Sequence, residues 1–307
     1  MPIQTLILHP MPCQLSSLAI AQEMLDTANR ISGFAGGQPV FDHQTLSPDE
    51  ALAQACNADL VILPGLGLAT PSELQHVMAG KDFVTLTQCL TALARPGVTV
   101  AGACSGCFAL GAAGLLDGRV VTTTWWLAPF LKSLFPKVRL DPSQIVRRDG
   151  DLITAGAAFA QIDLMLALIE QLGGFAMAED CRRFTMADSR PSQLPYLSVA
   201  TLVAGDPQLQ RAEIYLRRNI TRQVDLAELA EAAGLGARTF ARRLAQKAAM
   251  TPTEFSQTLR VTEAIRLART GDVPQSEIAH RVGYGDATAL RRVMRKRTGQ
   301  TLEHFKT

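Results

Sequence analysis

The residues best suited to chemistry in the first half of the chain lie where a strand-like run meets a helix-like one. The apolar run 98–103 leads into Cys104, Ser105 and Gly106, and a helix-like stretch follows. A cysteine on such a turn lies at a helix N-terminus, where main-chain N–H groups and the helix dipole favour a thiolate or hold a substrate carboxylate. A tight strand-to-helix turn needs the same small residues for steric reasons alone. On this motif the two interpretations are about equally favoured.

Other residues of this half are candidates for contact with a small ligand. A second loop, residues 63–67, also follows a strand-like run and is expected to present backbone donors to the same space. Either of the adjacent Trp125 and Trp126 could line a pocket for an aliphatic or cationic ligand, while at least one of them is expected in the core. A histidine at the end of the first strand is a structural or ligand-contacting group. The candidate ligand contacts are Cys104, Ser105, Gly65, Leu66, Gly67, Trp125 and His9.

Cys104 and Cys107 form a Cys-x-x-Cys pair, which is redox-active in some strand-to-helix settings. Cys107 falls one turn into the helix, where it is expected to pack as a small apolar residue. Cys89 and Cys181 supply no second pair at suitable spacing. We therefore expect no metal and no cofactor.

The last third of the chain carries two copies of one short pattern. Residues 226–244 and 276–297 each contain an amphipathic helix, a glycine turn and a second, basic helix, with Gly234 and Gly283 in the same place. A helix-turn-helix requires these features: small residues where two helices cross, a glycine at the turn and arginines on the exposed face of the second helix. Two units in tandem predict that one protomer reads two successive major-groove segments of double-stranded DNA.

Within each basic helix the packing and reading faces separate by helical period. Phe240 and Leu244 lie four residues apart and are expected in the core, as are Leu290 and Met294. Asp286 is expected to cap the second reading helix. The side chains expected to read bases are Arg238, Ala241, Arg242, Ala287, Thr288, Arg291 and Arg292. Those expected to contact phosphates are Arg243, Lys247, Arg295 and Lys296.

Charge is distributed unevenly along the chain. Residues 207–307 hold 18 Lys and Arg against 10 Asp and Glu, whereas residues 1–206 hold 12 against 18. This basic excess is typical of a nucleic-acid-binding domain attached to a domain with another role; a merely solvated basic face is disfavoured, because the arginines fall inside the second helix of each unit. No apolar run is long enough to cross a bilayer and the start is unlike a signal peptide. We expect a cytoplasmic protein without a membrane partner.

Strand-like and helix-like stretches alternate in the first half. Residues 5–9, 60–63, 98–103 and 152–155 are predicted strands, separated by helix-like stretches. This order predicts an α/β domain with a mostly parallel sheet and helices on both faces, followed by an all-α domain with two helix-turn-helix units. The predicted domains are 1–186 and 208–307, joined by a linker at 187–207 that is rich in Pro and Gly and has no clear period.

Both halves resemble known families. The last third resembles the AraC/XylS DNA-binding domain, through motifs that include Arg238-Thr239-Phe240, Thr251-Pro252, Val282-Gly283-Tyr284 and Arg297-Thr298-Gly299. The first half is similar to the class I glutamine amidotransferase-like (PfpI-like) domain that precedes this module in one subfamily of AraC regulators. The matching residues include Pro64-Gly65, Cys104-Ser105-Gly106, residues 113–119, Thr122-Thr123, Trp125 and Ile162-Asp163. The resemblance adds Asp163 to the candidate ligand contacts.

Two positions depart from the pattern of the enzymes in that family. Family members commonly carry a histidine just before the tryptophan, where this chain has Thr124, and an acidic residue in the first strand-to-helix loop, which falls near Ser17. A cysteine nucleophile needs a base or an oriented proton acceptor. We therefore expect no catalytic residues in this domain.

The sequence predicts a DNA-binding transcriptional regulator and not an enzyme. Its first domain is expected to sense a small-molecule effector, such as an amino acid, an amine or a related nitrogen compound, and to form a homodimer. Two alternatives stay open. One is a PfpI-like cysteine hydrolase or amidase, and the other is a redox sensor acting through Cys104.

Overall fold

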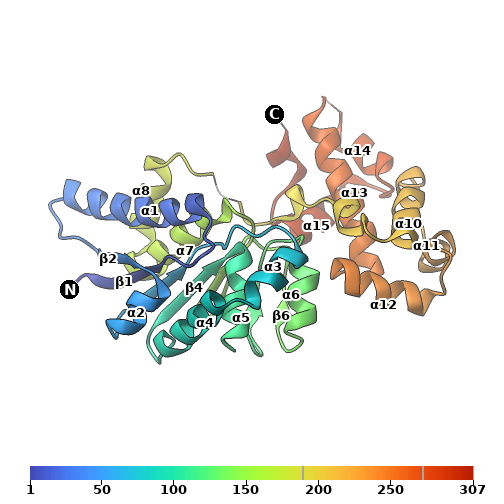
Figure 1. Ribbon diagram of the computed structural model, residues 1–307. Coiled ribbons are helices and arrows are strands. Elements are labelled where there is room, and N and C mark those ends of the chain that lie inside the picture. Colours follow the sequence, from blue (N-terminus) through green and yellow to red (C-terminus); the bar gives the residue numbers. More distant parts are fainter. Residues whose placement is uncertain (189, 272, 307) are drawn as a thin grey trace. The chain divides into compact units, whose positions relative to one another are not determined.

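The computed structural model describes residues 1–188, 190–271 and 273–306. The chain divides into two compact units, Met1–Arg190 and Pro191–Thr307. Blue to yellow-green ribbons in Figure 1 belong to the first unit, and yellow to red ribbons to the second.

A six-stranded sheet forms the centre of the first unit, in the order β2-β1-β3-β4-β8-β7. Every neighbouring pair is parallel except β7 with β8. A short parallel pair, β5 with β6, forms a second sheet. The strands are β1 (Ile3–Leu8), β2 (Phe41–Leu46), β3 (Leu60–Leu63), β4 (Thr99–Ala103), β5 (Val120–Val121), β6 (Arg139–Leu140), β7 (Val146–Asp149) and β8 (Leu152–Ala155).

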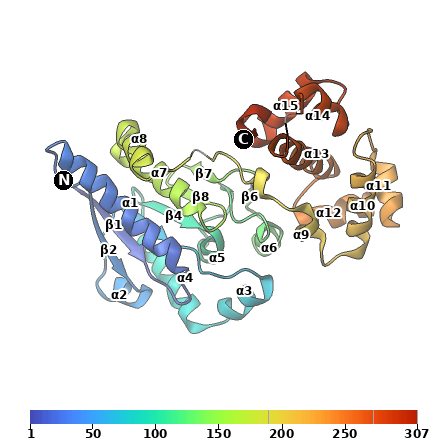
Figure 2. The same cartoon turned by 90° about the horizontal axis from the view of Figure 1, so that it is seen from above.

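Helices cover both faces of the main sheet (Figures 1 and 2). Side chains alternate across a strand: Leu6 and Leu8 of β1 join a core cluster with α2 to α6, while Ile7 joins another with α1, α7 and α8. The predicted α/β class with a mostly parallel sheet is confirmed. The helices are α1 (Leu15–Phe34), α2 (Pro48–Ala53), α3 (Pro71–Met78), α4 (Lys81–Leu93), α5 (Cys107–Ala112), α6 (Ala128–Leu134), α7 (Ala160–Gly173) and α8 (Phe175–Phe184).

The second unit is helical and contains both predicted helix-turn-helix pairs. The first pair is α11 with α12 and the second is α14 with α15, and α13 lies between them in the chain. Gly234 and Gly283 have φ angles of +68° and +77° at the two turns, a conformation that favours glycine. The helices are α9 (Val199–Val203), α10 (Pro207–Arg218), α11 (Leu226–Ala233), α12 (Ala237–Ala248), α13 (Pro252–Arg269), α14 (Gln275–Arg281) and α15 (Ala287–Thr298), with short 3₁₀ turns η2 (Leu194–Tyr196) and η3 (Leu302–Phe305).

The packing faces of both basic helices agree with the helical period. Phe240 and Leu244 are fully buried, and so are Leu290 and Met294 to within 2%. Asp286 caps α15 by accepting a hydrogen bond from the backbone N–H of Ala289 at 2.7 Å. Arginines on the opposite faces of these helices therefore point to solvent.

The stretch predicted as a linker is partly folded. From Pro191 onward the chain belongs to the second unit, and Leu194, Val199 and Val203 are each buried to 1% exposure. Their apolar pattern is hidden in the sequence because η2 and α9 are too short to show a period. Within the predicted ranges, Ser189, Asp272 and Thr307 lie outside the described residues.

Candidate functional site

Cys104 lies where β4 meets η1 (Cys104–Gly106), the turn that leads into α5. Its φ is +53°, a left-handed conformation that a non-glycine residue keeps only where its surroundings impose it. A Cβ at Gly106 would lie 2.6 Å from the carbonyl oxygen of Pro64, so the loop after β3 packs closely against this turn. Cys104 therefore stands on a sharp elbow between strand and helix.

The thiol of Cys104 is buried, at 4% exposure of the residue. Burial raises the pKa of this thiol above its ordinary value, and hydrogen bonds with Ser105 only partly oppose the rise. The thiol is therefore protonated at neutral pH. Burial of the sulfur thus has a larger effect on this pKa than the hydrogen bonds at the turn, which act in the direction of a thiolate.

Gly65 and Leu66 lie against the elbow. The N–H of Gly65 donates to Oγ of Ser17 at 3.2 Å, and the N–H of Leu66 donates to Oγ of Ser105 at 3.0 Å. A Cβ on Gly65 would lie 3.3 Å from the Cβ of Cys104. The structure thus brings four of the predicted contacts together, but it uses the two N–H groups to hold the loop in place.

Gln161, which sequence reasoning missed, adds a polar side chain to this region. It lies in the first turn of α7 with no exposed surface, and its Oε1 accepts a hydrogen bond from Ser17 at 2.8 Å. Its Nε2 has no hydrogen-bond partner in the described part of the chain, and neither has Oγ1 of the fully buried Thr124. Such a buried unpaired group costs about 1–3 kcal/mol. A ligand that offers an acceptor to Gln161 would recover that free energy.

Three other predicted contacts are tied to different surroundings. The backbone N–H of His9 donates to the carbonyl of Leu46, which aligns the ends of β1 and β2. Gly67 is exposed, with a φ of +73°. Trp125 stacks edge to face on Trp126, with ring centroids 5.3 Å apart. Both rings are half-buried; Trp126 packs against the core, and its Nε1 donates to the carbonyl of Ala69 at 3.0 Å.

Asp163 is engaged by Arg190, the last residue of the first unit. Oδ2 of Asp163 lies 2.6 Å from Nη2 of Arg190, and the aspartate side chain is 10% exposed. Burial raises the pKa of this carboxyl to about 6, against the opposing effect of Arg190. A hollow of about 440 Å³ lies alongside, lined by apolar residues that include Met24, Phe159 and Ile162. Asp163 thus secures the end of the first unit.

The solvent-exposed faces of α12 and α15 carry most of the side chains that are predicted to contact DNA. The exposed ones are Arg238, Arg242, Lys247, Thr288, Arg291, Arg292, Arg295 and Lys296, and the half-buried ones are Ala241, Arg243 and Ala287. Arg243 has an internal partner, because its Nε donates to Oδ2 of the buried Asp206 at 2.5 Å. Asp206 is also the N-cap of α10, so Arg243 links α12 to the start of α10.

Comparison with known proteins decides the family. Residues 28–171 match the DJ-1/PfpI family and residues 229–307 match a helix-turn-helix domain. The HTH-type transcriptional regulator CdhR of Pseudomonas aeruginosa is 30% identical over 286 residues, which cover 90% of this chain and 83% of that protein. The chain belongs to the AraC-type transcriptional regulators with a DJ-1/PfpI domain.

Two further comparisons cover only part of this regulator. A solved structure from Vibrio parahaemolyticus has a TM-score of 0.50 at 20% identity and covers 60% of this chain and 99% of its own, which supports the fold alone. The isonitrile hydratase of Pseudomonas putida is 41% identical over 83 residues, covering 26% of this chain and 34% of that enzyme.

Among the residues described, no helix is long and apolar enough to cross a membrane.

Proposed function

We propose that this regulator reads double-stranded DNA with α12 and α15 and binds a small effector at the Cys104 elbow without chemical turnover. The DNA role is supported by two tandem helix-turn-helix units whose second helices expose Arg242 and Arg292. Arginine on such a face can bond guanine through two hydrogen bonds. Exposed Lys247 and Lys296 are suited to phosphate contacts, which set the register of the protein on DNA.

The observation that carries the effector proposal is the buried Gln161 amide, which has no hydrogen-bond partner at Nε2 and is connected to the Cys104 elbow through Ser17 and Gly65. A protonated thiol is a poor nucleophile, and the Thr124 hydroxyl cannot act as the base that the histidine of related enzymes would supply. Gln161 offers an N–H group that requires an acceptor. We infer an effector with a carboxylate or amide oxygen, which favours an amino acid over a simple amine.

Ligand-induced thermal stabilisation tests this proposal. A screen of amino acids and amines on the full chain should yield compounds that raise the melting temperature, because a ligand of the folded state must stabilise it. Gln161→Met should abolish the rise. Gln171→Met is the matched control, since it lies in the same helix, where its side chain contacts Thr99 instead of Ser17. Equal rises in both variants would place the effector elsewhere.

A second candidate is a cysteine hydrolase or amidase of the PfpI-like group. The elbow conformation of Cys104 and the partial similarity to isonitrile hydratase favour it. It requires a base that activates the thiol, and the buried neighbours Thr124, Ser17 and Gln161 supply none. Turnover of any amide or isonitrile by the purified protein, lost on Cys104→Ala, would establish this activity.

We also propose that the regulator acts as a homodimer in the cytoplasm. Exposed aromatic residues on the first unit, Phe34, Phe159, Phe175 and Phe184, support a contact surface there. We further propose that residues 1–186 and 208–307 form two separate domains, and that the segment from Pro191 folds together with the second. Sedimentation equilibrium of the full chain tests the dimer.

A further inference from the structure

One charged side chain of the second unit is buried in an unusual setting. Arg260, in the middle of α13, is 3% exposed. A guanidinium is rarely buried unless its N–H groups are satisfied. Here it donates to three backbone carbonyl oxygens: Nη1 to Ile220 at 2.7 Å and Val282 at 2.5 Å, and Nη2 to Arg222 at 2.6 Å.

These carbonyls come from both helix-turn-helix units. Ile220 and Arg222 lie in the loop that leads into α11, the first helix of the first pair. Val282 follows α14, at the turn of the second pair. A further bond crosses at the same place, from Nε2 of Gln223 to the carbonyl of Gly283 at 2.6 Å. One arginine therefore holds the entry of the first pair to the turn of the second.

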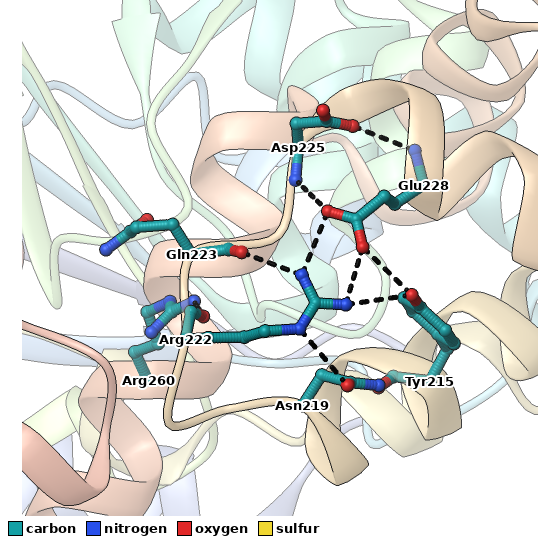
Figure 3. Close-up of polar contacts among 7 residues, drawn as sticks. All are labelled: Tyr215, Asn219, Arg222, Gln223, Asp225, Glu228 and Arg260. Carbon is teal, nitrogen blue, oxygen red and sulfur yellow. Dashed lines mark hydrogen bonds and ion pairs between the residues drawn. The ribbon is translucent and has the colours of Figure 1, made fainter.

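The loop that receives Arg260 is itself fixed to the first pair. Figure 3 shows the guanidinium of Arg222 facing both the carboxylate of Glu228 and the hydroxyl of Tyr215. Its two Nη atoms lie 3.0 Å and 2.5 Å from the carboxylate of Glu228, and Nη2 lies 3.0 Å from the hydroxyl of Tyr215. Glu228 in turn belongs to the capping box of α11. A continuous series of short polar contacts thus connects α13 to α11.

The two turn glycines, Gly283 and Gly234, differ in how closely Arg260 approaches them. A Cβ at Gly283 would collide with Nη1 of Arg260 and with the carbonyl oxygen of Ile220. At Gly234, the equivalent turn in the first pair, the nearest atom is Nη2 of Arg211 at 3.4 Å. Both glycines have a positive φ, so a side chain strains both turns, but only at Gly283 does it also displace Arg260.

We propose that Arg260 is a positioning residue that fixes the separation and angle of α12 and α15, so that the regulator selects operators by the spacing of their two segments. The proposal rests on the proposed function, in which both helices read one duplex. Successive major-groove segments lie about 34 Å apart along B-DNA, and one inserted base pair turns the second by roughly 34°. A rigid connection tolerates one spacing, whereas a loose one accepts several.

The test begins with duplexes that the full-length wild type selects from a random pool. Affinities are then measured for a selected duplex and for versions one base pair longer or shorter between its segments. The affinity of the wild type should fall roughly tenfold or more for either altered duplex, since one helix-turn-helix then loses its base contacts. Arg260→Met should bind all three within about threefold of one another. Arg266→Met, in the same helix but exposed and paired with Glu263, should behave as the wild type.

Gly283→Ala and Gly234→Ala supply an independent pair of variants in case Arg260→Met fails to fold. Gly283→Ala should lose the spacing preference, whereas Gly234→Ala should keep it. Electron-spin distance measurements between labels on Gln246→Cys and Lys296→Cys give a readout without DNA. The distribution should be narrow in the wild-type background and broad with Gly283→Ala or Arg260→Met.

An unchanged spacing preference in folded Arg260→Met or Gly283→Ala, or a label distance as narrow as in the wild type, would overturn the proposal. Failure of the wild type to select any duplex would instead reject the proposed function, and the label distances would still decide whether Arg260 holds the helices.

Discussion

Replacing Asp163 by asparagine should stabilise the first unit at neutral pH, although it removes one member of an ion pair. Burial raises the pKa of Asp163 from its ordinary value of 3.8 to about 6, with Arg190 only 2.6 Å away. The folded state therefore binds this proton more tightly than the unfolded state. The stabilisation of the folded state by this bound proton is complete below about pH 4 and is lost as the pH rises through about 6.

The magnitude follows from the same values. Each unit of pKa corresponds to about 1.4 kcal/mol, so a rise of roughly two pH units corresponds to about 3 kcal/mol of unfolding free energy. Asparagine keeps the shape and the carbonyl acceptor for Arg190 but cannot ionise. Asp163→Asn should therefore equal the wild type near pH 4 and exceed its stability by up to about 3 kcal/mol at pH 7.5.

Urea unfolding followed by tryptophan fluorescence measures this difference. Trp125 and Trp126 are the two tryptophans of the chain, and both lie in the first unit, so the signal reports that unit within the full-length protein. Glu179→Gln, which removes the acid of a more exposed pair with Arg182, should change stability by less than about 1 kcal/mol. The reasoning is refuted if Asp163→Asn is less stable than wild type at pH 7.5, or if the difference is the same at both pH values.

Three further outcomes are expected. Arg242→Ala should cost roughly 1–3 kcal/mol of binding to a specific duplex and little on a random one, whereas Lys296→Ala should weaken both about equally; titrations that show equal losses for Arg242→Ala would remove it from the base readers. Cys104→Ser should leave the effector response of a reporter largely intact, since a binding elbow does not need the sulfur; loss of the response together with wild-type turnover would favour the enzyme. Phe175→Ser should shift sedimentation equilibrium toward the monomer, and an unchanged dimer would exclude this part of the aromatic surface.

The inner strands could be predicted from sequence because they are buried on both faces and read as continuous apolar runs. The edge strands could not. β2 carries Asp42, His43 and Gln44 in its centre, and β7 is largely charged, with Arg147 and Arg148. At an edge only part of each strand contacts the core, so the alternating pattern is too weak to separate a strand from a loop.

Local features of the sites were predictable for a similar reason, and long-range ones were not. The Cys104 elbow and the exposed faces of α12 and α15 depend on neighbours within a few residues. Gln161 acquires its role from Ser17, 144 positions away, and Arg260 from Ile220, 40 positions away. Arg243 was predicted on phosphate by its helical face, while its ion pair with Asp206 arises from folding of the whole unit. A single sequence carries no sign of these partners.

The first turn of α7 holds Gln161 and Asp163 on one rigid segment, about 3 Å apart along the helix axis. One of these residues faces the elbow through Ser17, and the other grips Arg190, after which the chain enters the second unit. A single helical turn therefore connects the elbow to the end of the first unit. A ligand bound at the Gln161 amide would therefore lie within one helical turn of the Asp163–Arg190 ion pair, with only Ile162 between the two residues in the chain.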